Sequence, residues 1–345
     1  MRRLFFMRRA GVRRHLVRRL VLLLPALLGI SFVTFALLRL IPGDPAQVML
    51  GEHATAEQIA RFRVEQGLDQ PIPIQYLAYL ASLARGDLGR SIVTNLPVLA
   101  EIVQRLPATI ELSLGAMLTA CLIGLPLGAV AAYRRNSLID LIASSGTLLG
   151  VSMPLFWLGL LLSYLLGYRL GWLPPSGRLT LGIDLPPITH FYVLDSILAA
   201  RPQALADTLR HLILPSLTLS TVPLAIIVRM TRSCLLDELA QDHIRTARAK
   251  GLTDAVVLLR HAMKNALPAI ITMLGLQLGG LFSGAILTET IFSWPGMGQL
   301  IVDRILARDY PMVQGIVLVA TLLFVLINLA TDICYMYLNP RIRYE

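Results

Sequence analysis

The side chains that could do chemistry in this chain are few and lie far apart. Histidine and cysteine bind metals or take part in catalysis when several of them recur at short, fixed spacings. Here they occur singly along the sequence, as Cys121, Cys234, Cys334, His15, His53, His190, His211, His243 and His261. The sequence therefore predicts no metal site, no cofactor site and no catalytic residue of these types.

Motifs for nucleotide binding and hydrolysis are also missing from the sequence. A phosphate loop needs the pattern G-x-x-x-x-G-K-[ST], and the chain contains no Gly-Lys pair at all. Neither H-E-x-x-H nor G-x-S-x-G occurs, so proteolysis and lipid hydrolysis have no support. We expect no enzyme activity, and we expect ATP hydrolysis, if it is needed, to occur on another chain.

Carboxyl groups within apolar segments could couple transport to protons or sodium. Four candidates occur, namely Glu111, Asp140, Glu289 and Asp332. An ion-coupled carrier places such groups near the bilayer midplane, where burial is costly. Three of the four lie close to the ends of their apolar segments, and Asp332 lies near the inner end, within reach of Arg341 or Arg343. We therefore interpret all four as structural, which disfavours self-powered transport.

The elements that position these residues are membrane helices. The chain has 345 residues, of which 55% are hydrophobic and 15% charged, with a mean hydropathy of +0.67. Soluble proteins carry charge on about a quarter of their residues, so the composition predicts an all-α, polytopic membrane protein. Apolar runs long enough to cross a bilayer predict six spans, at 20–41, 108–132, 138–166, 211–228, 267–289 and 312–337.

Basic residues predict the orientation of these spans. Of the 31 Lys and Arg residues, 19 lie in the alternate segments 1–19, 133–137, 229–264 and 338–345, which are about half as long as the remaining loops. The positive-inside rule makes these segments cytoplasmic, together with both termini. The net charge of +10 thus follows topology and does not indicate a nucleic-acid binder. The basic tail 1–19 is either this orientation signal or a lipid-binding patch.

The two longest outer segments differ in character. Segment 42–107 carries a capping box at Thr55 and Gln58, a stop at Gly67, and helical apolar spacing from Pro73 to Arg85, so we expect a small helical insertion. Segment 168–207 is rich in Pro and Gly, so we expect an irregular loop with short helices at most.

The inner loop 229–266 has the strongest pattern. Gly251 separates two predicted helical pieces, and an apolar stripe is expected on one face of the second, formed by Leu252, Val256, Leu259, Met263 and Ala266. A basic, partly apolar helix pair suits docking into a groove on another protein. It suits an interfacial position on anionic lipid equally well, and periodicity leaves both open.

Small residues gather on the predicted fifth span. Glycines recur there four residues apart, a spacing that permits close helix packing. We expect Gly275, Gly279 and Ser283 to line a translocation path. Residues 108–345, which contain these three positions and the last five predicted spans, would then form one helical core.

Several stretches together resemble one family of membrane proteins. They are Arg245–Leu252 (RTARAKGL), Asn265–Pro268 (NALP), Ile41–Pro45 (IPGDP), Gly86–Ser91 (GDLGRS), Thr288–Gly298 (TETIFSWPGMG), Arg308–Gly315 (RDYPMVQG) and Asn339–Arg343 (NPRIR). In combination they are similar to the B-type permease of ABC importers of the dipeptide, oligopeptide and nickel branch. Arg245 and Thr246 stand where the general pattern has Glu and Ala. The likeness runs from about residue 18 to the C-terminus.

The resemblance implies partners and a site. The implied partners are a second homologous permease, two cytoplasmic ATP-binding subunits and an extracytoplasmic peptide-binding protein, all at a bacterial or archaeal plasma membrane. The implied ATPase-docking residues are Arg245, Thr246, Ala247, Lys250, Gly251 and Pro268. Family substrates include dipeptides, longer peptides, glutathione, haem precursors and nickel. The alternatives from other classes are a membrane scaffold without transport and a secondary carrier.

Overall fold

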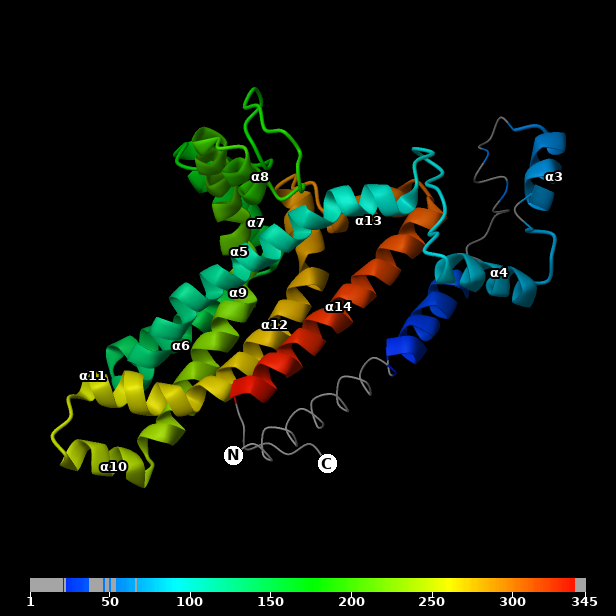
Figure 1. Ribbon diagram of the computed structural model, residues 1–345. Helices are drawn as coiled ribbons and strands as arrows, with labels where there is room; N and C mark the ends of the chain where they lie inside the picture. Colours follow the sequence, from blue (N-terminus) through cyan, green and yellow to red (C-terminus); the bar gives the residue numbers. More distant parts are fainter. Residues whose placement is uncertain are drawn as a thin grey trace.

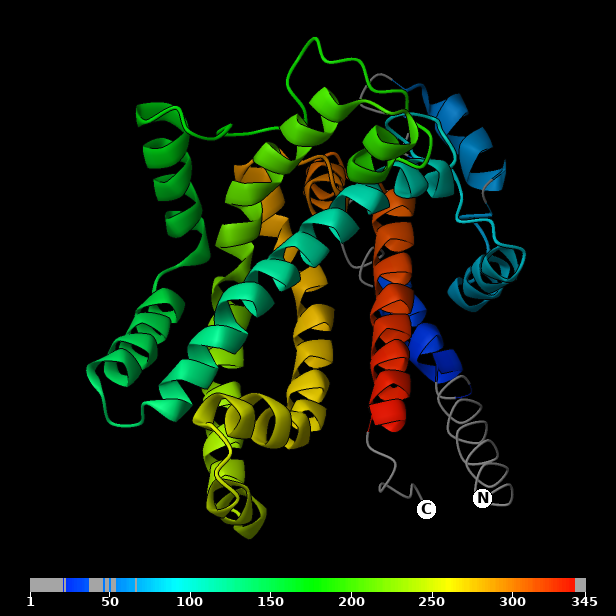
Figure 2. The ribbon, with the colours of Figure 1, turned by 60° about the vertical axis from the view of Figure 1, so that its left-hand side comes forward.

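The computed structural model describes residues 21, 23–36, 46, 50, 54–65 and 67–338, without the side chains of 65, 282–284 and 334–338. The predicted tail 1–19 lies outside these residues. The described part contains helices and no strand, so the predicted all-α class is confirmed. Its main body is a bundle of long helices (Figures 1 and 2), namely α5 (Val98–Tyr133), α9 (Pro202–Leu239), α12 (Met263–Ile291) and α14 (Tyr310–Leu338).

Within the described residues, between three and five segments are long and apolar enough to cross a bilayer. Three are single helices, at Val98–Tyr133, Pro202–Leu239 and Tyr310–Ile333. Two further segments are bent pairs, Leu138–Ser152 with Leu155–Arg169 and Asp254–Leu281 with Ala285–Ile291. The first predicted span appears as the shorter apolar helix Leu23–Ala36, and its expected ends lie outside the described residues. The number six therefore stays a prediction.

The predicted third span is not one straight helix. The structure divides it into α6 (Leu138–Ser152), α7 (Leu155–Leu162) and the π-helical turn η1 (Ser163–Arg169). The chain bends by 101° between α6 and the segment that α7 and η1 form together. Pro154 causes the break, because a proline ring disfavours the helical conformation of the residue before it. Met153 accordingly takes an extended ψ of 131°. Figure 2 shows this bent pair (green) at the edge of the bundle.

Two spans extend well beyond their predicted apolar runs. The structure begins α5 at Val98, ten residues before Ala108, and it continues α9 on both sides of the predicted 211–228. The extra turns carry charged residues, so a search for apolar runs misses them. Within the bundle α5 and α9 pack closely, and a Cβ on Gly124 would lie 2.9 Å from Cγ2 of Ile227.

The helical insertion after the first apolar helix forms as expected. The Thr55 amide donates to Oε1 of Gln58 at 2.9 Å, and the Gln58 amide donates to Oγ1 of Thr55, so the capping box is confirmed at the start of α3 (Ala56–Glu65). Gly67 follows with φ of +61°. The next helix, α4 (Ile72–Ala84), contacts the first apolar helix through Tyr76, whose hydroxyl lies 3.0 Å from Oγ of Ser31.

The segment 168–207 is largely irregular, as predicted, with one short helix α8 (Tyr192–Leu198). Asp195 of that helix organises the loop. It accepts hydrogen bonds from the hydroxyl and amide of Thr189 and from the amide of Ile188. Burial alone would raise the pKa of Asp195, but these hydrogen bonds outweigh burial and hold the pKa below its usual value. The carboxylate is therefore a charged anchor of the loop.

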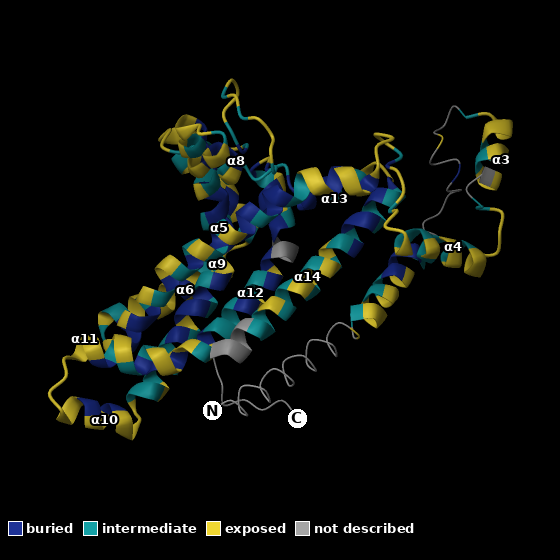
Figure 3. Ribbon diagram, in the orientation of Figure 1, coloured by how far each residue is buried: buried dark blue, intermediate teal, exposed yellow. Residues whose placement is uncertain are grey.

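The two ends of the bundle carry different elements. Figure 1 shows α8 and α13 (Met297–Leu306) at one end and α10 (Asp242–Ala249) with α11 (Asp254–Val256) at the other. The last described turns of α14 lie toward the α10 end. Buried residues follow the facing sides of the long helices (Figure 3). The bundle thus places the loop around Gly251 opposite the loop 168–207.

Two of the glycines expected to line a path lie in a helix contact. Gly275 and Gly279 are buried, and their missing side chains let α12 approach α14. A Cβ on Gly275 would lie 1.8 Å from Cγ2 of Thr331, and one on Gly279 would lie 3.1 Å from Cε2 of Phe324. Close packing between α12 and α14 thus explains these two glycines, and their place beside a translocation path stays a prediction. The side chain of Ser283 lies outside the described residues.

Replacing Gly275 by Ala should destabilise this contact. The new methyl group overlaps Thr331, so α12 and α14 must separate, at a cost of about 1–3 kcal/mol. Gly280 is the matched control, because it is exposed on the same helix and a Cβ there meets nothing within 4 Å. Thermal unfolding of the detergent-solubilised chain should show a lower midpoint for Gly275→Ala and no loss for Gly280→Ala. Equal midpoints would contradict the assigned contact.

Candidate coupling site

The inner loop folds into a helical hairpin that turns at Gly251. Helix α10 ends at Ala249, and Gly251 then adopts φ of +76°, a left-handed conformation that favours glycine. The chain continues through α11 and the π-helical turn η2 (Val257–Ala262) directly into α12. The predicted helix–Gly–helix arrangement is confirmed. A Cβ at Gly251 would meet nothing within 4 Å, so the backbone conformation and not packing requires glycine here.

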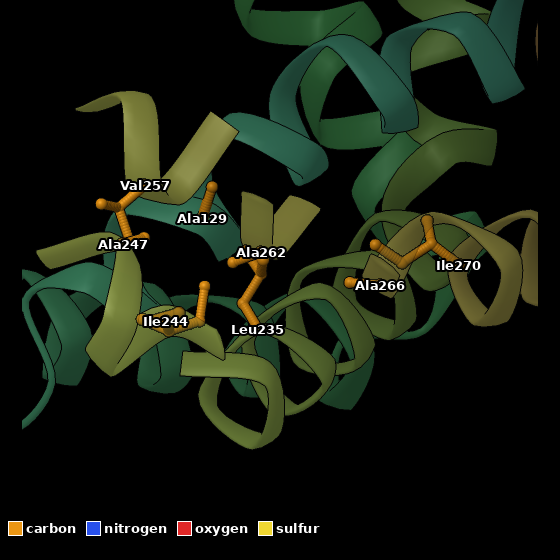
Figure 4. Close-up of a cluster of buried hydrophobic side chains, with 9 residues drawn as sticks. Ala129, Leu235, Ile244, Ala247, Val257, Ala262, Ala266 and Ile270 are labelled. Atoms are coloured by element: carbon orange, nitrogen blue, oxygen red, sulfur yellow. The ribbon is translucent and has the colours of Figure 1, made fainter. Parts of the chain in front are cut away.

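An apolar cluster holds this hairpin against the ends of the long helices (Figure 4). Ile244 and Ala247 of α10 point into it, and Leu235, near the end of α9, packs against them. The complete cluster is Ala129, Ala132, Leu235, Ile244, Ala247, Val257, Ala262, Ala266 and Ile270. The cluster joins α5, α9, α10 and α12, so the hairpin is packed onto three of the long helices.

The predicted apolar stripe is shifted from its expected register. Leu252, Val256 and Leu259 are exposed, by 39%, 37% and 65% respectively, and Met263 is only half-buried. The buried positions are Val257, Ala262, Ala266 and Ile270. The π-helical turn explains the shift, because it brings residues five positions apart, such as Val257 and Ala262, onto one face, where a regular α-helix would bring residues four positions apart. Only Ala266 of the predicted stripe is buried.

The predicted docking residues divide into exposed and buried groups. Arg245, Thr246, Lys250 and Gly251 are exposed, and the Arg245 side chain reaches 79% exposure. Ala247 faces the apolar cluster, with 6% exposure, so it contributes to packing and offers no docking surface. Pro268 lies half-buried inside α12, away from the hairpin turn. The exposed surface is thus formed by α10 and the Gly251 turn, with Leu252, Val256 and Leu259 beside it.

Two of the four carboxylates of the apolar segments form ion pairs. Glu111 accepts from Arg178 at 2.5 Å, and both side chains are buried. Asp140 accepts twice from Arg232, at 2.6 and 2.7 Å. Both contacts support the structural interpretation of these groups. The partners expected for Asp332, Arg341 and Arg343, lie outside the described residues.

Glu289 is held by uncharged donors. Its carboxylate is fully buried and accepts from the Thr109 hydroxyl and from the amides of Gly298 and Gln299, at 2.6, 2.7 and 3.0 Å. The two amides belong to the first turn of α13, where a negative charge is favourable. Glu289 therefore fixes α13 to the end of α12, which is also a structural role.

Sequence reasoning did not single out Arg178. Its guanidinium lies 3.7 Å from the ring centre of Tyr192 and 5.7 Å from that of Trp294, in addition to the bond with Glu111. These contacts tie the loop 168–207 to α5 and to the α12–α13 connection. An isolated arginine in a Pro- and Gly-rich loop carries no spacing signal, since its partners are distant in sequence.

Comparison with known proteins identifies the family. Residues 124–344 match the model of the binding-protein-dependent transport system inner membrane component, and residues 12–113 match the N-terminal model of the same kind of membrane component. The chain belongs to this family. Its description names one membrane component of a transport system that depends on a binding protein, so the chain is a multi-pass transport subunit. The family also confirms the prediction that the chain is not an enzyme.

Several relatives in this family of transport components align with nearly the whole chain. The di/tripeptide transport system permease protein DppB of Pseudomonas aeruginosa is 50% identical, over 96% of this chain and 98% of its own. The dipeptide transport system permease protein DppB of Escherichia coli K12 is 45% identical, with the same two coverages. The glutathione transport system permease protein GsiC of Salmonella choleraesuis is 39% identical, over 96% and 99%. The resemblance to the dipeptide branch is confirmed.

A solved structure shares the fold. A chain of the MetNI methionine ABC transporter, in an inward-facing conformation, superposes with a TM-score of 0.54 at 16% sequence identity. The match covers 70% of this chain and 97% of that chain. This chain therefore shares its fold with that chain of the transporter.

Proposed function

We propose that the chain forms half of the translocation path of an ATP-driven importer for dipeptides or short peptides. A second homologous permease would form the other half, two cytoplasmic ATP-binding subunits would supply energy, and an extracytoplasmic binding protein would deliver the substrate. Relatives named for dipeptide and di/tripeptide transport, at 45% and 50% identity over the full length, support this substrate class. The relative named for glutathione transport, itself a peptide, is more distant.

The observation that carries the proposal is the exposed hairpin at Gly251. It presents basic and apolar side chains together, with Arg245, Arg248 and Lys250 beside Leu252 and Leu259. Among the described residues, the apolar cluster packs the inner side of the hairpin and leaves these side chains exposed. A groove lined by apolar and acidic side chains on an ATPase would complement it. We therefore place ATPase docking at α10 and the Gly251 turn, using Arg245, Thr246, Lys250 and Gly251.

Replacing Gly251 by Val should abolish peptide uptake and leave the chain in the membrane. A β-branched residue at φ of +76° is strained by about 1–2 kcal/mol, so the turn must reorient α10. Gly86 is the matched control, since it has φ of +77°, open space around its Cβ and a place in the outer insertion. We expect Gly86→Val to retain uptake in the same vesicle assay. Near wild-type uptake by Gly251→Val, with normal ATPase association, would refute the docking assignment.

We further propose that both termini and the Gly251 hairpin are cytoplasmic and that α3 is outside. The distribution of basic residues supports this orientation. Single cysteines at exposed positions, Ala60→Cys and Lys250→Cys, test it in a chain without its native cysteines. A membrane-impermeant thiol reagent should label the first from outside intact cells and the second only after the membrane is opened. The reverse pattern would contradict the orientation.

A further inference from the structure

The coupling hairpin is held by directional polar contacts as well as by its apolar cluster. The first contact group joins three helices. The side-chain amide of Asn265, in α12, donates to Oε2 of Glu238, in α9, at 3.2 Å. The same amide nitrogen lies 3.3 Å from Nε2 of His243, in α10, which accepts when that nitrogen carries no proton. Asn265 therefore bridges α10 to two of the long helices.

A second contact group lies at the other end of the hairpin. The Tyr133 hydroxyl, at the end of α5, donates to Oδ2 of Asp254 at 3.0 Å. Asp254 begins α11 and also pairs with Nε of Arg248, in α10, at 3.7 Å. Asp254 thus links α10 to α5, the long helix that Asn265 does not reach. We call the Asn265 and Asp254 groups the two braces.

The two braces add directional contacts, which the apolar cluster lacks. Apolar contacts are non-directional and permit neighbouring helices to slide or rotate. Hydrogen bonds have strict distance and angle requirements, so the bonds of Asn265 and Tyr133 restrict how their helices rotate, while Arg248 adds an ion pair between α10 and Asp254 at 3.7 Å. Both braces are open to water in the free chain, with His243 at 43% and Asp254 at 54% side-chain exposure. Exclusion of water by a docked protein would strengthen them.

We propose that Asn265 and Asp254 are positioning residues that transmit ATPase motion from α10 to three membrane helices. This inference rests on the proposed function, because it assumes that an ATPase docks on the hairpin. Docking would still occur without the braces, since the exposed docking side chains are different residues. Without the braces, α10 would move relative to α5, α9 and α12 without moving them. Each ATP hydrolysed would then import less peptide.

The test measures peptide imported per ATP hydrolysed, in the complete transporter reconstituted with its binding protein. The variant Asn265→Ala removes both Asn265 contacts of the first brace and leaves His243 at 3.7 Å from Glu238, and Tyr133→Phe removes one hydroxyl from the second brace. Each should retain ATPase association and hydrolysis and lower the ratio by about fivefold, equivalent to about 1 kcal/mol of coupling free energy. Gln241→Ala is the matched control, because the side-chain amide of Gln241 makes a local bond, to the carbonyl of Asp237 four residues earlier, at 3.4 Å. It should leave the ratio unchanged.

A double-mutant cycle separates bracing from direct contact with the ATPase. If Asn265 acts through Glu238, the double variant Asn265→Ala/Glu238→Ala should be no worse than either single variant. An unchanged ratio in Asn265→Ala, or fully additive losses in the double variant, would overturn the proposal. Loss of ATPase association in Asn265→Ala would overturn it too, because the residue would then be a docking contact. Failure of the wild-type chain to bind any ATPase would instead refute the proposed function.

Discussion

Replacing Arg178 by Met should lower the free energy of unfolding by about 3–5 kcal/mol, because the change leaves the Glu111 carboxylate buried without its cation. The two side chains are 4% and 7% exposed, so water cannot substitute for the guanidinium. The variant also loses the hydrogen bond to the His190 carbonyl and the stacking over Tyr192. Thermal unfolding of the purified chain, together with its steady-state level in the membrane, measures the effect.

A second variant distinguishes charge burial from loss of packing. Arg178→Met combined with Glu111→Gln removes both charges, and the new amide can still accept from the Val193 amide as Glu111 does at 2.8 Å. We expect this double variant to recover most of the lost stability, since the uncompensated charge is gone. The contrary result would be a loss of unfolding free energy in the double variant equal to the added losses of Arg178→Met and Glu111→Gln. It would show that Arg178 does not stabilise the chain through the ion pair.

Local features of the fold were predictable from local sequence. The capping box at Thr55 and Gln58 and the turn at Gly251 each depend on a few neighbouring residues, and both are confirmed. The apolar runs after residue 107 located the long apolar helices of the described part, because lipid requires long uncharged segments. Their true ends were missed where a helix continues past the apolar run, as α5 does from Val98.

Features that depend on distant residues were not predictable in this way. The bond between Glu111 and Arg178 joins a long helix to an irregular loop, and neither residue has a periodic signal. The spacing of Gly275 and Gly279 indicated close helix packing, but the residue that Gly275 packs against, Thr331, lies on another helix and could not be predicted from spacing. A single π-helical turn after Val256 shifted the whole apolar stripe of the hairpin. Periodicity assumes a regular helix and fails at such a turn.

The energy source of transport separates an ATP-driven importer from an ion-coupled carrier. The chain has no phosphate loop, so any use of ATP must come from a partner. Glu111 and Asp140 are neutralised by arginines, and Glu289 caps α13. These carboxylates already have structural partners, so they are poorly placed to carry protons or sodium through the bilayer.

Uptake of a labelled dipeptide into liposomes tests this account most directly. The liposomes would contain the chain and its sister permease, with or without the two ATP-binding subunits, internal ATP and external binding protein. We predict accumulation only when all of these components are present, and none under an imposed proton or sodium gradient without the ATPases. Concentrative uptake by the two permeases alone, abolished by an uncoupler, would contradict the account and make the chain a carrier.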